Sequence, residues 1–304
     1  MRILLAGATG AIGRPLIRGL KQQGHCVTGL VRSAEARPVL AEMGAEAVIG
    51  DALDAASVRA AIAHVRPEAV INELTSLPRH YTPEEMKAAA ERDSKVRREG
   101  NVNLLAAMRE GGVRRYVLQS SGFWYAPGSA LADETTPLAV DATPGVSASA
   151  RTYVELESTA FRAADIDCVA MRYGFFYGPG TWYRNDGDIG EQVRRRQVPI
   201  IGEGQGVSSF VHIEDAASAT VAALECAPGA YNIVDDDPSP QCVWLPAFAR
   251  ACGAPEPPRI TEQDAVVAAG ADSVYYATRL RGASNEKARR DLDFRPRRLE
   301  WLRL

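Results

Sequence analysis

The chain has 304 residues, 46% of them hydrophobic and 24% charged, which is typical of a globular protein large enough to bury a core. Its formal net charge of −3 lacks the basic footprint of a nucleic-acid-binding protein, and no stretch approaches the ~20 apolar residues of a membrane helix. Its five cysteines, an odd number without C-x-x-C spacing, predict neither disulfides nor a zinc site, and they are typical of reduced thiols in the cytoplasm.

Short, nearly continuous apolar strands alternate with amphipathic helices over the first two-thirds of the chain. We expect strands at 2–6, 26–31, 46–49, 68–72, 115–119 and 166–171, and helices at about 11–23, 34–43, 54–64, 83–110 and 150–164. This alternation predicts an α/β fold in which helices cover both faces of a doubly wound parallel sheet.

The composition changes after Arg172, where glycine, proline and aromatic residues become frequent. We expect helices near 186–197, 214–226 and 243–252, and a strand at 230–234. The sequence therefore predicts a first domain at 1–173 and a smaller C-terminal α/β lobe at 174–304. The strand near 230–234 is left free to rejoin the first sheet.

A glycine-rich turn, Gly7-Ala-Thr-Gly10-Ala-Ile-Gly13, joins the first strand to the first helix. Gly7 permits the tight turn, Gly10 lets the backbone approach a pyrophosphate, and Gly13 lets the helix pack closely on the strand. The phosphates would bind the amides at the helix N-terminus. Because the triplet follows a strand and opens a helix, it predicts a Rossmann unit that binds a nicotinamide dinucleotide.

The end of the second strand bears on the choice of cofactor. An NAD-binding unit usually has an acidic residue there, whereas this chain has Arg32 and Ser33, which suit a 2′-phosphate. The sequence therefore favours NADP(H) over NAD(H), with a solvated charge at a helix start as the alternative for Arg32. Asp51 closes the third strand, where it can meet the adenine edge or cap the next helix.

Five motifs in order carry a family resemblance. They are Gly7-x-x-Gly10-x-x-Gly13, Gly50-Asp51-x-x-Asp54, Tyr116-Val-Leu-Gln-Ser-Ser121, Arg172-Tyr-Gly-Phe-Phe-Tyr-Gly-Pro179 and Phe210-Val-His-Ile-Glu-Asp215. Together they resemble an extended, here atypical, short-chain dehydrogenase/reductase of the NAD-dependent epimerase/dehydratase family. The resemblance implies a Rossmann domain that carries NAD(P) and a smaller lobe that closes over a small-molecule substrate.

The resemblance also implies roles for individual residues. Ser121 matches the serine or threonine that meets the reacting oxygen. A homodimer is left open, although the charge-rich segment 83–99 is typical of a solvated helix face. The implied cofactor contacts are Gly7, Thr9, Gly10, Ala11, Ile12, Gly13, Arg32, Ser33, Asp51, Ala52, Leu74, Thr75, Tyr173, Gly174 and Phe175.

The chain departs from the family at the Tyr-x-x-x-Lys motif, which occurs nowhere in it. In one register Tyr153 is the tyrosine and Glu157 stands where lysine belongs. In the other, Ser149 replaces the tyrosine and Tyr153 the lysine, while Glu157 matches a family glutamate. Neither register predicts a cation that lowers the pKa of a tyrosine. The candidate proton-transfer residues are Tyr153, Ser121, Tyr177 and Glu157.

Aromatic residues cluster at strand ends and loops, where an α/β sheet binds its ligand. Phe123, Trp124, Trp182 and Tyr183 suggest a ring-lined substrate pocket, with packing between the lobes as the alternative. We expect no metal site. The sequence therefore predicts an NADP(H)-dependent oxidoreductase or epimerase acting on a small carbonyl, hydroxyl or sugar-like compound. A non-catalytic dinucleotide sensor, or a redox-neutral isomerase or lyase with a structural nucleotide, are the alternatives.

Overall fold

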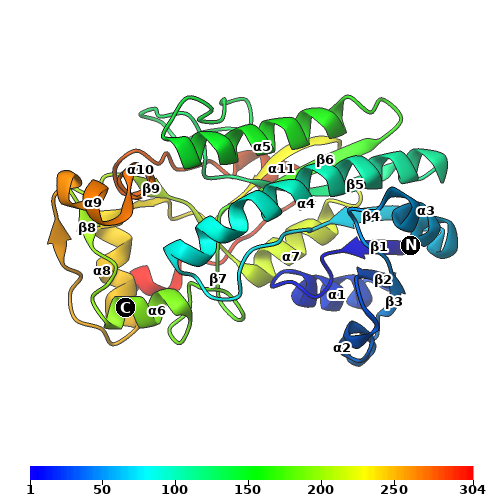
Figure 1. Ribbon diagram of the computed structural model, residues 1–304, viewed down its shortest axis with the longest axis horizontal. Helices are drawn as coiled ribbons and strands as arrows, with labels where there is room; N and C mark the ends of the chain where they lie inside the picture. Colours follow the sequence, from blue (N-terminus) through cyan, green and yellow to red (C-terminus); the bar gives the residue numbers. More distant parts are fainter. Residues whose placement is uncertain (304) are drawn as a thin grey trace.

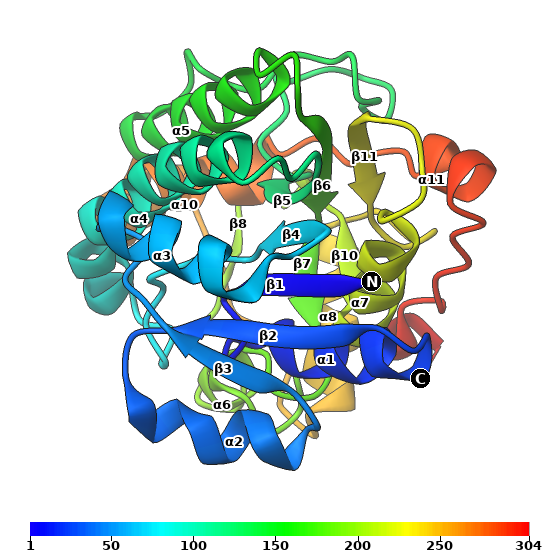
Figure 2. The same ribbon diagram turned by 90° about the vertical axis from the view of Figure 1, so that its right-hand side faces the viewer.

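A seven-stranded parallel sheet in the order β11-β6-β5-β4-β1-β2-β3 forms the centre of the computed structural model, which describes residues 1–303 (Figures 1 and 2). The order of its first six strands is the doubly wound one, so the expected fold is confirmed. The strands are β1 (Arg2–Ala6), β2 (Cys26–Val31), β3 (Glu46–Ile49), β4 (Ala69–Asn72), β5 (Arg115–Ser121), β6 (Asp167–Tyr173) and β11 (Gly229–Ile233).

Helices cover both faces of this sheet (Figure 2). Strand residues alternate between the two apolar layers, so Ile3 and Leu5 face one layer and Leu4 faces the other. On one face lie α3 (Ala55–Val65), α4 (Pro83–Glu110) and α5 (Pro144–Phe161). On the other lie α1 (Gly13–Gln22), η1 (Ala34–Ala36), α2 (Arg37–Glu42), α7 (Ile213–Ala222) and α11 (Glu286–Asp291).

The remaining elements form a smaller lobe beside the carboxyl ends of the strands, on the left in Figure 1. They pair as β7 (Phe175–Tyr177) with β10 (Phe210–His212), β8 (Ile200–Ile201) with β13 (Arg259–Ile260), and β9 (Val207–Ser208) with β12 (Ser239–Pro240). The lobe's helices are α6 (Asp188–Arg194), α8 (Gln241–Ala251), α9 (Glu262–Ala269), α10 (Ala271–Thr278) and η2 (Glu300–Arg303).

The part of the chain after residue 173 contributes to the smaller lobe and also to the central sheet and its helices. β11 pairs in parallel with β6, with Tyr231 opposite Met171, which is the return to the first sheet that the sequence left open. Ile213 and Ala288 also belong to the apolar layer beneath the sheet. A boundary at 173 therefore falls at the end of β6. It does not separate the central sheet from the lobe, because later segments return to the sheet.

Local sequence sets several helix boundaries. Asp54 accepts a hydrogen bond from the amide of Ala56 at 2.9 Å and so caps α3. The helix expected at 150–164 begins earlier, because Pro144 fits a first helical turn. Pro38 likewise lies in the first turn of α2, which follows a short 3₁₀ turn. Within residues 1–303 no helix is both long and apolar enough to cross a membrane.

Candidate functional site

The glycine turn lies at the carboxyl end of β1, and its three glycines are needed for different reasons. Gly7 has φ +87°, and a Cβ there would lie 2.3 Å from the carbonyl oxygen of Glu73. A Cβ on Gly13 would lie 2.4 Å from the carbonyl oxygen of Ala8. A Cβ on Gly10 would meet only the oxygen of Gly7, at 3.2 Å. The exposed side of the turn at Gly10 is thus open to a ligand.

The first turn of α1 suits a phosphate. Its N-cap residue Ile12 offers no side-chain cap, and the turn holds no acidic residue, so the amides and the positive end of the helix dipole stay available. Thr9, Gly10 and Ala11 are exposed around it. These features fit the pyrophosphate of a dinucleotide.

Some of the other predicted nucleotide contacts are exposed side chains, and others already have a hydrogen-bond partner in the protein. Arg32 and Ser33 are exposed just after β2, and Thr75 is exposed after β4. The carboxylate of Asp51 accepts from the amide of Leu53 at 2.9 Å. Because Asp54 caps α3, capping is not the role of Asp51.

Backbone contacts hold three further predicted nucleotide-binding residues in position. The carbonyl of the buried Ala52 accepts from Asn103 at 2.8 Å, and the amide of Leu74 donates to Asn72 at 3.1 Å. A Cβ on the buried Gly174 would lie 2.5 Å from the carbonyl oxygen of Ser209, so close packing requires glycine there.

Tyr173 belongs to a buried chain of oxygens. Its hydroxyl lies 2.9 Å from Oε1 of Glu73 and 2.6 Å from Oγ1 of Thr220, which donates to the carbonyl of Ala216 at 2.7 Å. Oε2 of Glu73 is buried and has no hydrogen-bond partner among residues 1–303. Burial raises the pKa of Glu73 to about 8, against the opposing effects of Tyr173 and Arg97. The carboxyl of Glu73 is therefore neutral at neutral pH. Sequence reasoning missed this residue, because no motif marks it.

Glu157 forms a buried ion pair. The guanidinium of Arg172 donates to its two oxygens at 2.8 and 2.6 Å, and the hydroxyl of Ser120 donates to it at 2.5 Å. Occupied on both oxygens, Glu157 is a poor candidate for proton transfer.

Tyr153 has a cation beside it, which the sequence analysis did not predict. The guanidinium of Arg97, from α4, lies 5.1 Å from the centre of the Tyr153 ring. It donates to Asp93 at 2.7 Å and to Gln119 at 3.0 Å. Burial raises the pKa of Tyr153 to about 12, although Arg97 opposes the shift. Tyr153 is therefore a neutral phenol, able to donate a proton but not to act as a base at neutral pH.

The expectation that the segment 83–99 is a solvated helix face is wrong at Arg97. This residue is 5% exposed, and its salt-bridge partner Asp93 is also buried in large part. The pattern of charges on a helix does not distinguish a surface ion pair from one turned inward, and the i,i+4 spacing of Asp93 and Arg97 fits both.

The predicted substrate aromatics form two groups. Phe123 stacks on Phe175 with ring centres 4.1 Å apart, and Trp124 lies 5.4 Å from Tyr153. Nε1 of Trp124 donates to Tyr276 of α10 at 2.8 Å, which ties the lobe to the end of β5. The sequence did not single out Tyr276.

Trp182 and Tyr183 lie further into the lobe. Trp182 donates to the carbonyl of Arg79 at 3.1 Å and packs on Tyr81. Tyr183 packs among Phe210 and Trp244 in the lobe's apolar core. Packing between elements therefore accounts for these two rings.

Tyr177 and Ser121 differ as candidates for proton transfer. Tyr177 packs between His212 and Trp301, and its hydroxyl donates to the carbonyl of Arg298 at 3.4 Å, so it is a lobe-core residue. His212 accepts from the amide of Glu214 at 3.2 Å and caps α7. The hydroxyl of Ser121, at the carboxyl end of β5, is fully buried and has no hydrogen-bond partner within residues 1–303, so its hydrogen-bonding capacity is unused.

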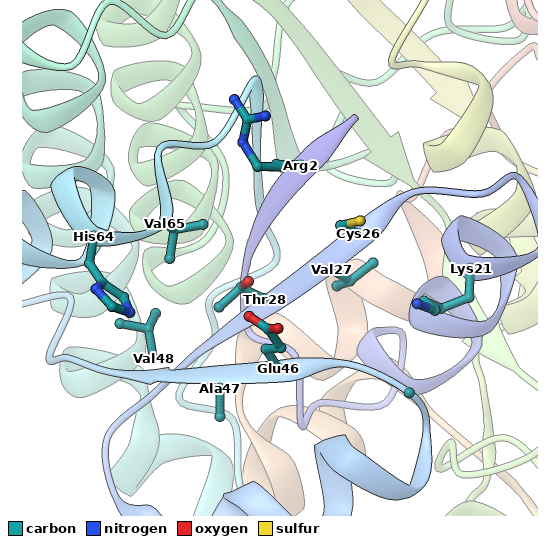
Figure 3. Close-up of a pocket in the computed structure, with 11 residues that line it drawn as sticks. Arg2, Lys21, Cys26, Val27, Thr28, Glu46, Ala47, Val48, His64 and Val65 are labelled. Atoms are coloured by element: carbon teal, nitrogen blue, oxygen red, sulfur yellow. The ribbon is translucent and has the colours of Figure 1, made fainter.

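A surface groove at the opposite ends of the strands is separate from this site. Figure 3 shows it between Arg2, Glu46 and His64, at the amino ends of the first three strands. Ligands of open α/β sheets bind at the carboxyl ends. We therefore assign the groove no part in the site. Within residues 1–303 no cluster of His, Cys, Asp or Glu could hold a metal ion.

Comparison with known proteins agrees with this geometry. A model of the NAD dependent epimerase/dehydratase family matches residues 3–233. The chain is 40% identical, over 99% of its own length and 98% of the relative's, to a Streptomyces sp protein named "3-diazoavenalumate denitrifying reductase". It is 27% identical, over 93% of its length and 86% of the relative's, to "2-alkyl-3-oxoalkanoate reductase" of Stenotrophomonas maltophilia.

Solved structures share the fold. UDP-glucose 4-epimerase of Thermotoga maritima aligns with a TM-score of 0.75 at 20% identity, covering 99% of this chain and 96% of that one. UDP-glucose 4-epimerase of Thermus thermophilus, solved with NAD, aligns with a TM-score of 0.73 at 24% identity, covering 100% and 97%.

The doubly wound sheet and the glycine turn define a Rossmann-fold protein with a dinucleotide cradle. The chain belongs to the NAD dependent epimerase/dehydratase family, the extended short-chain dehydrogenases/reductases that the sequence motifs resemble. This membership supports a nicotinamide dinucleotide as its cofactor.

Proposed function

We propose that this protein is an NAD(P)H-dependent reductase that removes a diazo group from a small aromatic carboxylate. The observation that carries the proposal is the 40% identity, over nearly the whole of both chains, to the denitrifying reductase of Streptomyces sp. In such a reaction the carbon–nitrogen bond breaks, N2 leaves with its electron pair, and a carbon–hydrogen bond forms. A bound NAD(P)H supplies the hydride, and with it the two electrons.

The proton chemistry of the site is consistent with this reaction. An aryl carbon that loses N2 and gains a hydride needs no base, whereas alcohol oxidation does. Tyr153 lacks the lysine of its family and is held as a neutral phenol by burial. The site is therefore better suited to reduction than to oxidation.

The aromatic rings at the mouth of the site fit an aromatic substrate. Phe123 and Phe175 are stacked and only partly buried, and Trp124 joins them to Tyr153. Ring faces also attract a positively polarised group such as a diazo nitrogen. We assign these rings to substrate binding. We propose that Ser121 lies beside the reacting carbon of the substrate.

The glycine turn and the residues after β2 would hold the nucleotide. The amides that follow Gly10 would bind the pyrophosphate, and Arg32 with Ser33 would bind a ribose 2′-phosphate, which is why we propose NADP(H) over NAD(H). The nearest acidic residue after β2 is Glu35, whose carboxylate pairs with the Ser33 side chain, so Arg32 carries this preference.

A second candidate is the reduction of a 3-oxo acid. It rests on the more distant relative, whose named substrate is a 2-alkyl-3-oxoalkanoate. A neutral Tyr153 could donate the proton that the new hydroxyl needs. The named substrates of both relatives are carboxylates.

The test is to supply the full chain and NADPH with an arenediazonium carboxylate or with a 3-oxo acid. Consumption of NADPH and release of N2 in equal amounts, in excess of the enzyme-free reaction, is the expected result. Consumption with the 3-oxo acid alone supports the second candidate. If neither compound is reduced while the nucleotide still binds, a dinucleotide sensor is the better account. A Gly10→Val variant controls for reactions outside the cradle.

A further inference from the structure

Two neighbouring side chains in the site combine deep burial with polar tips that have no partner. Arg97 is 5% exposed and Tyr153 is 7% exposed. Arg97 uses Nε for Asp93 and Nη1 for Gln119, so Nη2 makes no hydrogen bond within residues 1–303. The Tyr153 hydroxyl makes none either. Neither atom is among the fully enclosed polar atoms that lack a partner, so each keeps a small exposed area within a deeply buried pair.

The contrast with Arg172 separates this arrangement from a structural one. Arg172 is also buried, but all three of its nitrogens donate, to Glu157, to Tyr125 and to the carbonyl of Glu134. A buried arginine that only supports the fold has its donors satisfied in this way. Arg97 instead presents one edge of its guanidinium, beside a free phenol, at the carboxyl ends of β4 and β5.

We propose that Arg97 and Tyr153 form a subsite that binds an anionic oxygen of the substrate, a carboxylate or a phenolate. The inference rests on the proposed function, since it names the residues that hold the anionic end of that substrate. Tyr153 donates one hydrogen bond and the Nη2 group of Arg97 donates another. A charge-assisted hydrogen bond of this kind is about twice as strong as a neutral one.

The surrounding charges permit an anion there. Asp93 of α4 balances Arg97, and Gln119 of β5 holds it without adding charge. Glu73, after β4, is the other carboxyl that acts on both Arg97 and Tyr153. Being neutral, it does not repel a second anion. The Trp124 ring packs on Tyr153 and reduces access of water, which strengthens hydrogen bonds to a bound oxygen.

The test measures binding rather than turnover. Cinnamate and its uncharged analogue cinnamamide are titrated into the full chain by calorimetry, with and without saturating NADP⁺. In a second arm, 4-nitrophenolate is compared with 4-nitroanisole, which separates a carboxylate from a phenolate. We expect at least one anion to bind tenfold or more tightly than its neutral partner.

Variants then assign the preference to its residues. Arg97→Met is expected to remove at least tenfold of the preference, Arg97→Lys to restore part of it, and Tyr153→Phe to weaken it severalfold. Arg98→Met, one residue along on the exposed face, is the matched control and is expected to change nothing. If Arg97→Met fails to fold with Asp93 unpaired, the double variant Asp93→Asn/Arg97→Met leaves no buried charge.

Equal binding of both anions and their neutral analogues would overturn the subsite, as would a preference that survives in the Arg97→Met or the double variant. An anion preference that depends on Arg97 in a protein that reduces neither test substrate would leave the subsite standing and reject the proposed reaction. The two failures are therefore distinguishable.

Discussion

The hydroxyl of Tyr173 donates a hydrogen bond to the buried carboxyl of Glu73 at 2.9 Å, and burial keeps that carboxyl protonated at neutral pH. Three short contacts link Glu73, Tyr173, Thr220 and the carbonyl of Ala216. In the first of these contacts Tyr173 is the donor to Glu73. Burial raises the pKa of the Glu73 carboxyl to about 8, although the hydrogen bond from Tyr173 opposes the shift.

The proton on the Glu73 carboxyl makes stability depend on pH. The unfolded chain releases the proton of Glu73 near 4.5, whereas the folded chain keeps it until about 8. The contribution is therefore fully present below pH 4.5 and is lost as the pH rises to about 8, at a slope of ~1.4 kcal/mol per pH unit. Urea unfolding at pH 6 and pH 9 should show the wild type losing free energy of unfolding relative to Glu73→Gln.

A matched control isolates the effect of burial. Glu68 is an exposed glutamate before β4, so Glu68→Gln should keep the pH dependence of the wild type. Parallel pH profiles for the wild type and Glu73→Gln would mean that Glu73 is ionised in the folded protein.

Substitutions in the glycine turn should separate effects on folding from effects on nucleotide binding. Gly7→Ala should lower the melting temperature of the nucleotide-free protein, because the new Cβ meets the backbone of Glu73 and the φ of +87° is strained. Gly10→Val should lower that temperature less than Gly7→Ala, because its Cβ meets only the oxygen of Gly7 at 3.2 Å, and it should abolish the stabilisation by NADP⁺. Differential scanning calorimetry measures both. Stabilisation that persists in Gly10→Val would move the phosphates away from α1.

The buried pair of Glu157 and Arg172 should act on stability. Glu157→Gln leaves a buried guanidinium without its counter-charge and should cost about 3 kcal/mol or more in free energy of unfolding. The exposed pair of Arg98 and Glu155 is the comparison, and Glu155→Gln should cost ~1 kcal/mol or less. If Glu157→Gln abolishes turnover at unchanged stability, Glu157 transfers a proton after all.

We expect the choice between NADP(H) and NAD(H) to depend on Arg32. A charge-assisted contact to a 2′-phosphate contributes on the order of 1.5–3 kcal/mol, so NADP⁺ should bind about tenfold or more tightly than NAD⁺. Calorimetric titration of both nucleotides should show this preference in the wild type and its loss in Arg32→Ala. Equal affinities in the wild type would contradict the assignment.

The central sheet and the glycine turn could be predicted from local sequence patterns. Apolar runs such as Arg2–Ala6 and the turn at Gly7 and Gly10 depend on residues close together in sequence, so their spacing carries the information. The same holds for the ends of β5 and β6, where Ser121 and Tyr173 lie opposite each other.

The polar interior of the site could not be predicted in this way. Arg97 lies 56 residues before Tyr153, and nothing in a charge-rich helix indicates which of its charges turns inward. Glu73 follows an ordinary apolar strand, and its neutral charge results from burial against Tyr173, 100 residues away. Tyr276 reaches Trp124 only through the packing of α10 against the sheet domain. Each depends on tertiary contacts.

The most direct test of the proposed reaction is isotopic. The full chain is given NADPH that carries deuterium at nicotinamide C4 together with an arenediazonium carboxylate, and the product is analysed by mass spectrometry and NMR. The account predicts deuterium on the ring carbon that lost N2, with N2 released in equal amount. Product that contains solvent hydrogen at that carbon, or that retains both nitrogens, would contradict it.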